Sequence, residues 1–543
     1  MENVKKEKQW IFDGNKFWHD SILDGLEEIS YEGKTHYAYR NLPNSLYESL
    51  IKSEEHWPDK NCIVDDEGKK YTYHQFLQIV DQLAGYLYHF YHVKQGAQVG
   101  VLLYNSLEFC ASVYAINRLR AVAVPMPTKY RRQEVNSLIE KADLDGIIFH
   151  SDFSEWFREK EDKKFKMCML KDVLCTLSHI PKPPIFLSKP EDAAVLMFTS
   201  GTTSSSKGVL IKNYNIMHAI AVYQKVFQIT ERDKTVIATP AYHATGLVAL
   251  MGLFLYSGGC IWLHKFFDAQ RIMKEVEEQR LTFIHASPTV FSFLLEQKEQ
   301  YPKIPSIRVM ACGSSNMPKQ KIKELKEWMP KARFQTVYGL TETTSPATIL
   351  PEDAAESIYL GSSGVPIPGV QFQICDLTGN SLPPMNTGVI LVRGTTVTEG
   401  YYHREHSLIE GGWLDTGDLG YFNEKGFLYV VDRKKDMINR GGEKICSLDV
   451  ENVLYEMAEI KEAAVVGIPD ERYGEVPAAM VVIAESKLPT EEKILSVMKT
   501  QLATYQLPVK IEFCKKLPMT ANLKIDKKKI RELLSKENME EKQ

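Results

Sequence analysis

Apolar runs alternate with amphipathic stretches over roughly the first 330 residues of the chain. Residues 72–75, Thr-Tyr-His-Gln, have the capping-box pattern of a helix start. Apolar residues follow at helical spacing, at Phe76, Ile79, Val80, Leu83 and Leu87. The apolar runs 99–103 and 121–125 predict buried strands on either side of a further helical stretch. This alternation predicts an α/β fold in which helices cover both faces of a sheet.

The pattern changes after about residue 360. Short strand-like runs with Gly/Pro turns between residues 360 and 432 predict a β-rich subdomain. A polar run at 432–436 ends it. A helix near 448–457, strands at 463–468 and 478–483 and a helix near 491–503 then predict a compact α+β piece. Residues 1–45 show no clear periodicity, so we expect an irregular, aromatic-bearing lead-in.

The longest apolar run, residues 247–263, is interrupted by Ser257, Gly258 and Gly259. A membrane-spanning helix needs about 20 consecutive apolar residues, which this run does not reach. We therefore expect a buried helix that ends near Tyr256, followed by a buried strand at 260–263, and no transmembrane segment.

The chain has 543 residues, too many for one ordinary core, with 44% hydrophobic and 25% charged residues, as in soluble globular proteins. A net charge of −4 argues against nucleic acid as the main partner. Nine cysteines occur with no C-x-x-C pair, which favours reduced thiols, a cytoplasmic location and no zinc site. The charged N-terminus shows no secretory signal.

Residues 199–209, Thr-Ser-Gly-Thr-Thr-Ser-Ser-Ser-Lys-Gly-Val, form the segment with the clearest chemistry. They follow the apolar run 193–198, which predicts a buried strand. Backbone N–H groups, hydroxyls and the charge of Lys207 suit a loop that wraps phosphates. Lys207 lies between Ser206 and Gly208, so the segment is not a Walker loop. Taken alone, it is also compatible with a surface turn.

Five further segments accompany this loop along the chain. They are 240–246 (Pro-Ala-Tyr-His-Ala-Thr-Gly), 338–343 (Tyr-Gly-Leu-Thr-Glu-Thr), 413–420 (Trp-Leu-Asp-Thr-Gly-Asp-Leu-Gly), 432–442 (Asp-Arg-Lys-Lys-Asp-Met-Ile-Asn-Arg-Gly-Gly) and, more weakly, 517–525 (Leu-Pro-Met-Thr-Ala-Asn-Leu-Lys-Ile). In content and order they resemble the motifs of the adenylate-forming superfamily, which includes acyl- and aryl-CoA synthetases. The resemblance covers most of the chain.

The resemblance implies an ATP-dependent acyl- or aryl-CoA synthetase that uses Mg²⁺ and CoA, with fatty acid metabolism as one setting. A carboxylic acid and ATP would give an acyl adenylate, and the CoA thiol would then take the acyl group. One alternative transfers the acyl group to the phosphopantetheine of an acyl carrier protein. Another is a nucleotide-binding protein whose catalysis has degenerated. The sequence says nothing about oligomeric state.

The resemblance also implies roles for single residues. Thr199, Ser200, Gly201, Thr202, Thr203 and Lys207 would hold the β- and γ-phosphates. Gly313, Ser314 and Ser315 would form the wall against adenine, with Tyr338 and Gly339 nearby. Thr341 would contact the α-phosphate, Glu342 would bind Mg²⁺, and Asp418 and Arg433 would bind the ribose. His243 would lie between the nucleotide and acyl pockets, and Lys524 would bridge the carboxylate and the α-phosphate.

Five of these residues also have a simpler interpretation. His243 is compatible with a packed core histidine, Thr341 and Glu342 with a helix cap, Asp418 with a surface turn and Lys524 with a solvated charge.

The family hinge corresponds to Lys435. This implies an N-terminal domain of residues 1–434 and a mobile C-terminal domain of residues 435–543. Rotation at the hinge would withdraw Lys524 and bring Gly441 and Gly442 to the adenylate. Two adjacent glycines suit close approach by the pantetheine arm of CoA.

Three positions depart from the family pattern. Ser204 replaces a common glycine, Ser206 a common proline, and Leu523 the glycine that usually precedes the lysine. A side chain at a position that needs positive φ restricts the loop. We therefore expect weaker or slower use of ATP, but not its loss.

The motif at 240–246 also bears on the substrate. Tyr242 and His243 occupy the place where amino-acid-activating domains typically carry Phe-Asp, which argues against an amino-acid substrate. We expect the acyl pocket to be lined by residues around 243–248, 287–290, 313–315 and 339–343. The apolar stretch 247–255 favours an apolar acyl group.

Overall fold

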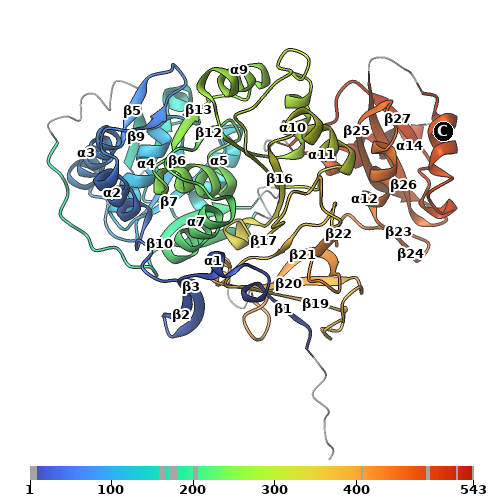
Figure 1. Ribbon diagram of the computed structural model, residues 1–543, viewed down its shortest axis with the longest axis horizontal. Coiled ribbons are helices and arrows are strands. Elements are labelled where there is room, and N and C mark those ends of the chain that lie inside the picture. Colours follow the sequence, from blue (N-terminus) through green and yellow to red (C-terminus); the bar gives the residue numbers. More distant parts are fainter. Residues whose placement is uncertain are drawn as a thin grey trace, which may run out of the picture.

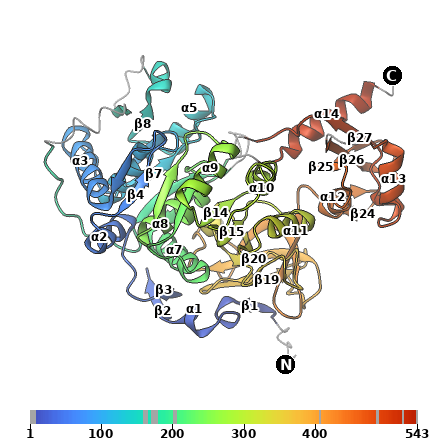
Figure 2. The ribbon, with the colours of Figure 1, turned by 45° about the horizontal axis from the view of Figure 1, so that its top comes forward.

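The computed structural model describes residues 9–157, 165–169, 180–199, 206–404, 408–484, 489–520 and 524–540. Figures 1 and 2 both show a large body, coloured blue to orange, and a smaller C-terminal lobe, coloured red, beside it. The large body contains two β-sheets with helices around them and a third sheet rich in turns.

The first sheet has the strand order β11-β10-β7-β6-β8-β9 and is parallel except between β10 and β11. Its strands are β6 (Gln98–Leu102), β7 (Val122–Pro125), β8 (Gly146–His150), β9 (Phe165–Met169), β10 (Ala193–Phe198) and β11 (Gly208–Lys212). Val99 and Val101 pack in the core with α3 (Tyr73–Tyr91) and α4 (Leu107–Arg118). Leu102 packs on the opposite face with α5 (Arg132–Lys141). Helices therefore cover both faces, as predicted.

The second sheet has the order β18-β17-β16-β15-β14-β12-β13-β4-β5 and is parallel from β16 to β4. Its strands are β4 (Asn61–Val64), β5 (Lys70–Thr72), β12 (Lys234–Ile237), β13 (Cys260–Leu263), β14 (Phe283–Ala286), β15 (Val309–Cys312), β16 (Arg333–Tyr338), β17 (Thr348–Ile349) and β18 (Val365–Pro366). One face packs against α9 (Ala269–Gln279), α10 (Pro288–Leu295) and α11 (Lys319–Trp328). The other face shares a core with the first sheet, α2 (Leu46–His56) and α7 (Asn213–Phe227).

The predicted helix and strand at 247–263 are confirmed, with one difference. The segment begins as a π-helix, Thr245–Gly252, and continues as α8 (Leu253–Tyr256) before β13. Single-turn π-helical bulges occur frequently at functional sites. Within the described ranges, no helix is long and apolar enough to cross a membrane.

The third sheet corresponds to the predicted β-rich subdomain. Its order is β1-β19-β20-β21-β22, all antiparallel. The strands are β1 (Ile11–Asp13), β19 (Val370–Cys375), β20 (Gly388–Gly394), β21 (Leu414–Phe422) and β22 (Leu428–Arg433).

The expectation of an irregular lead-in was wrong. β1 pairs with β19, and Phe12 stacks on Phe422 with ring centroids 4.0 Å apart. Residues after it form α1 (Asp20–Leu23) and the hairpin of β2 (Leu26–Tyr31) and β3 (Lys34–Tyr39). The partner of β1 lies some 360 positions away in the sequence, so local periodicity cannot reveal the pairing.

The C-terminal lobe has a sheet in the order β24-β23-β26-β25, with β27 pairing to β26. Its elements are β23 (Ile438–Arg440), β24 (Glu443–Ile445), α12 (Ser447–Tyr455), β25 (Ile460–Asp470), β26 (Gly474–Ile483), α13 (Glu491–Met498), β27 (Ile511–Cys514) and α14 (Lys527–Glu540). Apolar residues of α12 and α13 pack on one side of this sheet, and Ile530 and Leu534 of α14 pack on the other. The predicted strands and helices of this region are confirmed, although α13 ends earlier than expected.

The capping box at the start of α3 provides a test of local stability. The Gln75 backbone N–H donates to Oγ1 of Thr72, and the Thr72 N–H donates to Oε1 of Gln75. We expect Thr72→Ala to lower the free energy of unfolding by about 1 kcal/mol, because it removes the acceptor for an N–H of the first turn. Thermal unfolding measures the effect. Thr72→Ser keeps the hydroxyl and should stay near wild type; equal loss in both variants would contradict the capping role.

Candidate active site

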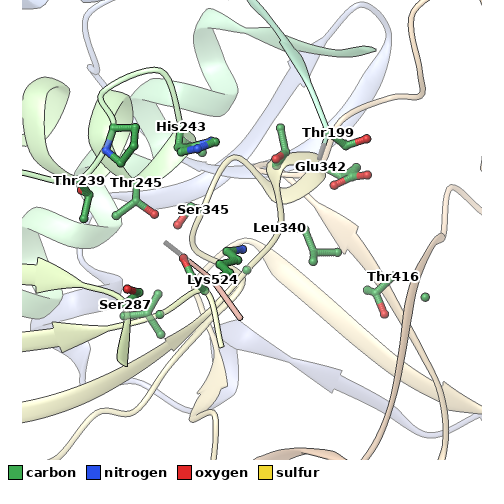
Figure 3. A pocket seen from close by; sticks show the side chains of 18 of the residues that line it. Thr199, Thr239, His243, Thr245, Ser287, Leu340, Glu342, Ser345, Thr416 and Lys524 are labelled. Atoms are coloured by element: carbon green, nitrogen blue, oxygen red, sulfur yellow. The ribbon is translucent and has the colours of Figure 1, made fainter. Parts of the chain in front are cut away.

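A cavity of about 530 Å³ lies between the large body and the C-terminal lobe. Segments far apart in sequence form its wall: residues after β10, β12, β14, β15 and β16, the stretch 414–417 of β21, Arg433 and Lys524. In Figure 3, Thr199 and Glu342 lie toward one end, Thr239, Thr245 and Ser287 toward the other, and Lys524 between them.

The position of the cavity follows from the sheet topology. Strands β16, β15, β14 and β12 are consecutive neighbours and parallel, so their carboxyl ends meet at one edge. Ligands of open α/β sheets bind outside these ends. Small residues there, such as Ala286, Gly313 and Gly339, leave room for a ligand.

Many of the predicted residues line this one cavity. They are Thr199, Lys207, His243, Gly313, Ser314, Gly339, Thr341, Glu342, Arg433 and Lys524. The predicted acyl-pocket segments each contribute as well, through residues 243–245, Ser287, Gly313 and Ser314, and 339–342.

Other predicted residues do not line it. Ser315 is exposed outside the cavity. Lys435 is exposed in the segment that joins the two parts, and Gly441 and Gly442 are exposed between β23 and β24 of the C-terminal lobe. Ser200, Gly201, Thr202 and Thr203 lie outside the described residues, as do the departures at Ser204 and Leu523.

The end of the cavity near Lys207 contains a contact that the sequence did not suggest. The ammonium of Lys207 lies over the ring of Tyr401, 4.4 Å from its centroid. The Tyr401 hydroxyl donates to Oε1 of Glu342 at 2.8 Å. Tyr401 therefore touches both a candidate phosphate-binding lysine and the candidate magnesium ligand. In the sequence, the only feature that marks Tyr401 is its position directly after Gly400.

Two hydrogen bonds between Thr199 and Lys207 join the ends of the predicted phosphate loop. The Thr199 N–H donates to the Lys207 carbonyl at 2.9 Å, and the Lys207 N–H donates to Oγ1 of Thr199 at 3.3 Å. Ser206, which replaces a proline of the family pattern, is buried, and its Oγ has no hydrogen-bond partner in the described part of the chain.

Asp418 and Tyr338 lie directly behind the wall and do not line the cavity. The Tyr338 hydroxyl donates to Oδ2 of Asp418 at 2.8 Å, and Nε of Arg433 lies 3.3 Å from Oδ1. Asp418 is 3% exposed, and this burial raises the pKa of its carboxyl, against the opposing effects of Arg433 and Tyr338. Its neighbours at 415–417 form the wall instead.

Lys524 reaches the cavity from the C-terminal lobe, where it is hydrogen-bonded to Thr520. The Thr520 N–H donates to the Lys524 carbonyl at 2.7 Å, and the Lys524 N–H donates to Oγ1 of Thr520 at 3.3 Å. Burial, followed by the charge of Arg433, lowers the pKa of Lys524 to about 8, while Asp418 acts in the opposite direction. A desolvated ammonium at this position favours an anionic ligand.

The other end of the cavity is lined by hydroxyls and imidazoles. Thr239, His243, Thr245, His285, Ser287 and Ser345 contribute to it. Burial lowers the pKa of His285 to about 3, so its ring is neutral. The Oγ of Ser287 and the Nδ1 of His285 are buried without a hydrogen-bond partner in the ranges that the structure describes.

The apolar stretch 247–255 carries no information about the acyl group. Its side chains from Leu247 to Leu255 lie in the core between the two sheets, and the nearby residues that line the cavity, 243–245, precede the stretch. A helix buried on all sides is apolar whatever ligand binds near its end.

The chain matches two protein-family models and known relatives. Residues 50–402 match the family model of AMP-binding enzymes, and residues 449–524 match the model of the AMP-binding enzyme C-terminal domain. A 2-succinylbenzoate–CoA ligase of Bacillus cereus (strain Q1) is 34% identical over 503 residues, which cover 91% of this chain and 99% of the relative.

The chain is also similar to solved structures of CoA synthetases. The o-succinylbenzoate CoA synthetase of Bacillus subtilis with its acyl-adenylate intermediate has a TM-score of 0.79 at 28% identity, covering 89% of this chain and 97% of that chain. The same enzyme with ATP and a magnesium ion gives 0.78, again at 28% identity, covering 88% and 98%. A fatty acyl CoA synthetase of Mycobacterium tuberculosis gives 0.71 at 25% identity, covering 91% and 99%. The chain therefore belongs to the family of AMP-binding enzymes, within the adenylate-forming superfamily of acyl- and aryl-CoA synthetases.

Proposed function

We propose that this acid–thiol ligase joins a compact carboxylic acid with a second hydrogen-bonding group to CoA, and that 2-succinylbenzoate represents this class. The observation that carries the proposal is the convergence of Lys524, from the C-terminal lobe, with Lys207 and Glu342 of the large body in one cavity. The carboxylate attacks the α-phosphorus of ATP and releases pyrophosphate. The CoA thiol then attacks the acyl carbon and releases AMP.

The first step requires two anions to meet, and cations at the cavity wall reduce their repulsion. Lys524 lies between the two ends of the cavity in Figure 3, where a carboxylate and an α-phosphate would meet. Lys207 and Thr199 lie near the end assigned to the outer phosphates, and Thr341 is on the wall nearby. Preorganised positive charge in a site that excludes water is an effective way to stabilise such a transition state.

The residues present fit a magnesium ion. Glu342 offers a carboxylate at the phosphate end of the cavity. Mg²⁺ is usually bound by one or two carboxylates together with phosphate oxygens and waters. Glu342 would hold the ion, which when bound would neutralise phosphate charge. Tyr401 orients the Glu342 carboxylate through its hydrogen bond.

The nucleotide contacts implied by the resemblance remain proposals. Gly313, Ser314 and Gly339 are on the wall where adenine would lie, and Arg433 is on the wall where the ribose would lie. Asp418 would reach the ribose by exchanging its bond from Tyr338 for one from a ribose hydroxyl.

The size and polarity of the cavity support a compact acid. Its volume of about 530 Å³ must hold the nucleotide as well as the acyl group. Buried Ser287 and neutral His285 offer hydrogen bonds that a long alkyl chain cannot satisfy, and an unsatisfied buried polar group is costly. An acid such as 2-succinylbenzoate therefore suits this end of the cavity better than a long fatty acid does.

For the second step we propose a rotation about Lys435, between domains of residues 1–434 and 435–543. Gly441 and Gly442 have φ values of 60° and 99°, and a Cβ at Gly442 would meet no atom within 4 Å. This exposed backbone suits the approach of the pantetheine arm once the lobe has turned.

We also propose the cytoplasm as the location of the enzyme. The described part of the chain contains seven free cysteines, six of them buried. Reduced thiols are typical of cytosolic proteins.

The deciding experiment measures pyrophosphate release with Mg-ATP and a panel of acids, with and without CoA. The panel contains 2-succinylbenzoate, simple benzoates, fatty acids and amino acids. CoA-dependent turnover that favours 2-succinylbenzoate or another compact polar acid supports the proposal. Preference for long fatty acids would contradict the substrate class. Adenylate that accumulates without CoA-dependent turnover would indicate a carrier-protein acceptor instead.

We expect Lys524→Ala to lower adenylate formation by about 10²–10³-fold, because the cation between the two anions is lost. ATP–pyrophosphate exchange measures this step. Thioester formation from supplied acyl adenylate and CoA should be retained, since Lys524 leaves the cavity for that step. Equal loss of both steps would show that Lys524 acts in maintaining the fold.

Lys435→Pro should have the opposite effect. Proline fixes φ and restricts the preceding residue, so it blocks rotation at this position. Among the described residues, none accepts a backbone hydrogen bond from Lys435, so the variant should keep adenylate formation. Thioester formation from acyl adenylate should fall. Normal CoA turnover would place the hinge elsewhere.

The lowered pKa of Lys524 predicts a pH dependence. A lysine is a cation below its pKa, so the free enzyme loses this charge as the pH rises through about 8. We expect kcat/KM for ATP in the exchange reaction to fall above this pH. Lys524→Arg stays charged at all these pH values and should remove the alkaline decline, at lower activity. The same decline in Lys524→Arg would assign it to another group.

A further inference from the structure

A buried polar network joins the large body to the C-terminal lobe beside the active site. Asp432, the residue before the end of β22, is 5% exposed, and Ser447, the first residue of α12, is fully buried. The backbone N–H and the hydroxyl of Ser447 both donate to Oδ2 of Asp432 at 2.8 Å. A carboxylate at a helix N-terminus also interacts favourably with the helix dipole.

The network continues to α14. The Lys527 ammonium donates to Oγ of Ser447 at 2.7 Å and pairs with Oε1 of Glu451 at 2.8 Å. The same Glu451 oxygen accepts from the Val465 N–H at 2.8 Å. Burial acts to lower the pKa of Lys527, but the carboxylates of Glu451, Asp432 and Asp436 outweigh it and raise the pKa. Lys527 is therefore charged and held by several partners.

Both ends of the network adjoin residues that line the cavity. Asp432 precedes Arg433, and Lys527 follows Lys524 by three residues. The loop between Lys524 and α14 is short and closed, since the Asp526 N–H donates to the Pro518 carbonyl at 2.8 Å. A fixed Lys527 thus fixes the base of the loop that carries Lys524.

We propose that Asp432, Ser447, Glu451 and Lys527 form a hinge network that positions Lys524 for adenylate formation. The inference rests on the proposed function. Asp432 precedes Lys435 in the chain, while Ser447, Glu451 and Lys527 follow it. A rotation about Lys435 therefore separates Asp432 from Ser447 and leaves the Lys527–Glu451 pair intact within the lobe. The contact between Asp432 and Ser447 belongs to the adenylate-forming arrangement alone.

The hinge network contributes no group to the cavity, so its members are positioning residues. Their loss should lower the rate of adenylate formation while leaving the KM for ATP nearly unchanged, because the nucleotide is held by the large body. A residue that only stabilised the fold would lower both half-reactions together.

The test uses Asp432→Asn and Lys527→Met in the full chain, with Lys528→Met as the matched control because Lys528 is an exposed neighbour outside the network. ATP–pyrophosphate exchange with Mg-ATP and 2-succinylbenzoate reports the first step. Thioester formation from supplied 2-succinylbenzoyl adenylate and CoA reports the second. We expect exchange to fall roughly 10-fold or more in both network variants, since small displacements of a catalytic group are costly. The second step should be retained.

Equal loss of both half-reactions, or wild-type exchange in both variants, would overturn the proposal. Lys527→Met leaves Glu451 buried without its cation, which is strongly destabilising. The double variant Lys527→Met/Glu451→Gln removes both charges and should show the same selective loss of exchange. Lys527→Arg keeps the charge and should restore part of the rate of ATP–pyrophosphate exchange. If neither the double variant nor Lys527→Arg gives the expected result, the proposal is also overturned.

Failure of the proposed function has a different signature. If the wild-type enzyme shows no exchange with any acid of the panel, the proposed function fails. Hydrogen–deuterium exchange of the backbone amides of Lys524 and Asp526 then still tests the network without any substrate. Faster amide exchange in Lys527→Met than in Lys528→Met supports the positioning of the loop, and equal exchange contradicts it.

Discussion

The desolvated charge of Lys524 is the constraint on which the rest of the active site depends. Burial and the nearby Arg433 lower its pKa to about 8, so the ammonium is held in a place that is unfavourable for a cation. An anionic ligand in the cavity removes this disadvantage, which ties the position of the lysine to the presence of the reacting phosphate and carboxylate. The same residue belongs to the C-terminal lobe, so both parts of the molecule contribute to the cavity wall.

The cavity has a floor from the large body and a roof from the C-terminal lobe. Carboxyl ends of parallel strands in the second sheet form the floor, with small residues where the ligand must approach the backbone. Tyr401 holds Lys207 and Glu342 together at the phosphate end. The roof is the loop of Lys524, whose base is held by the hinge network. Under the proposed rotation about Lys435, this roof would leave the floor, and one cavity would serve two successive reactions.

Much of this could be predicted because the signals are local. The strand at 193–198 and the capping box at Thr72 coincide with β10 and the start of α3, since a short apolar run and a cap depend on neighbouring residues. Motif order placed Lys207, His243, Glu342 and Lys524 in one site, and the fold brings them to one cavity. The roles given to those residues remain proposals.

The sequence by itself determined the α/β class, the family and the residue types that carry the chemistry, because these follow from periodicity and from motifs that are contiguous in the chain. Tertiary structure alone decided which residues meet. It paired β1 with β19 and buried the apolar residues after Thr245 in the core. It also brought Tyr401 into contact with Glu342 and Lys527 into contact with Glu451. Contacts between segments tens to hundreds of positions apart depend on how sheets and lobes pack, and no local pattern encodes them.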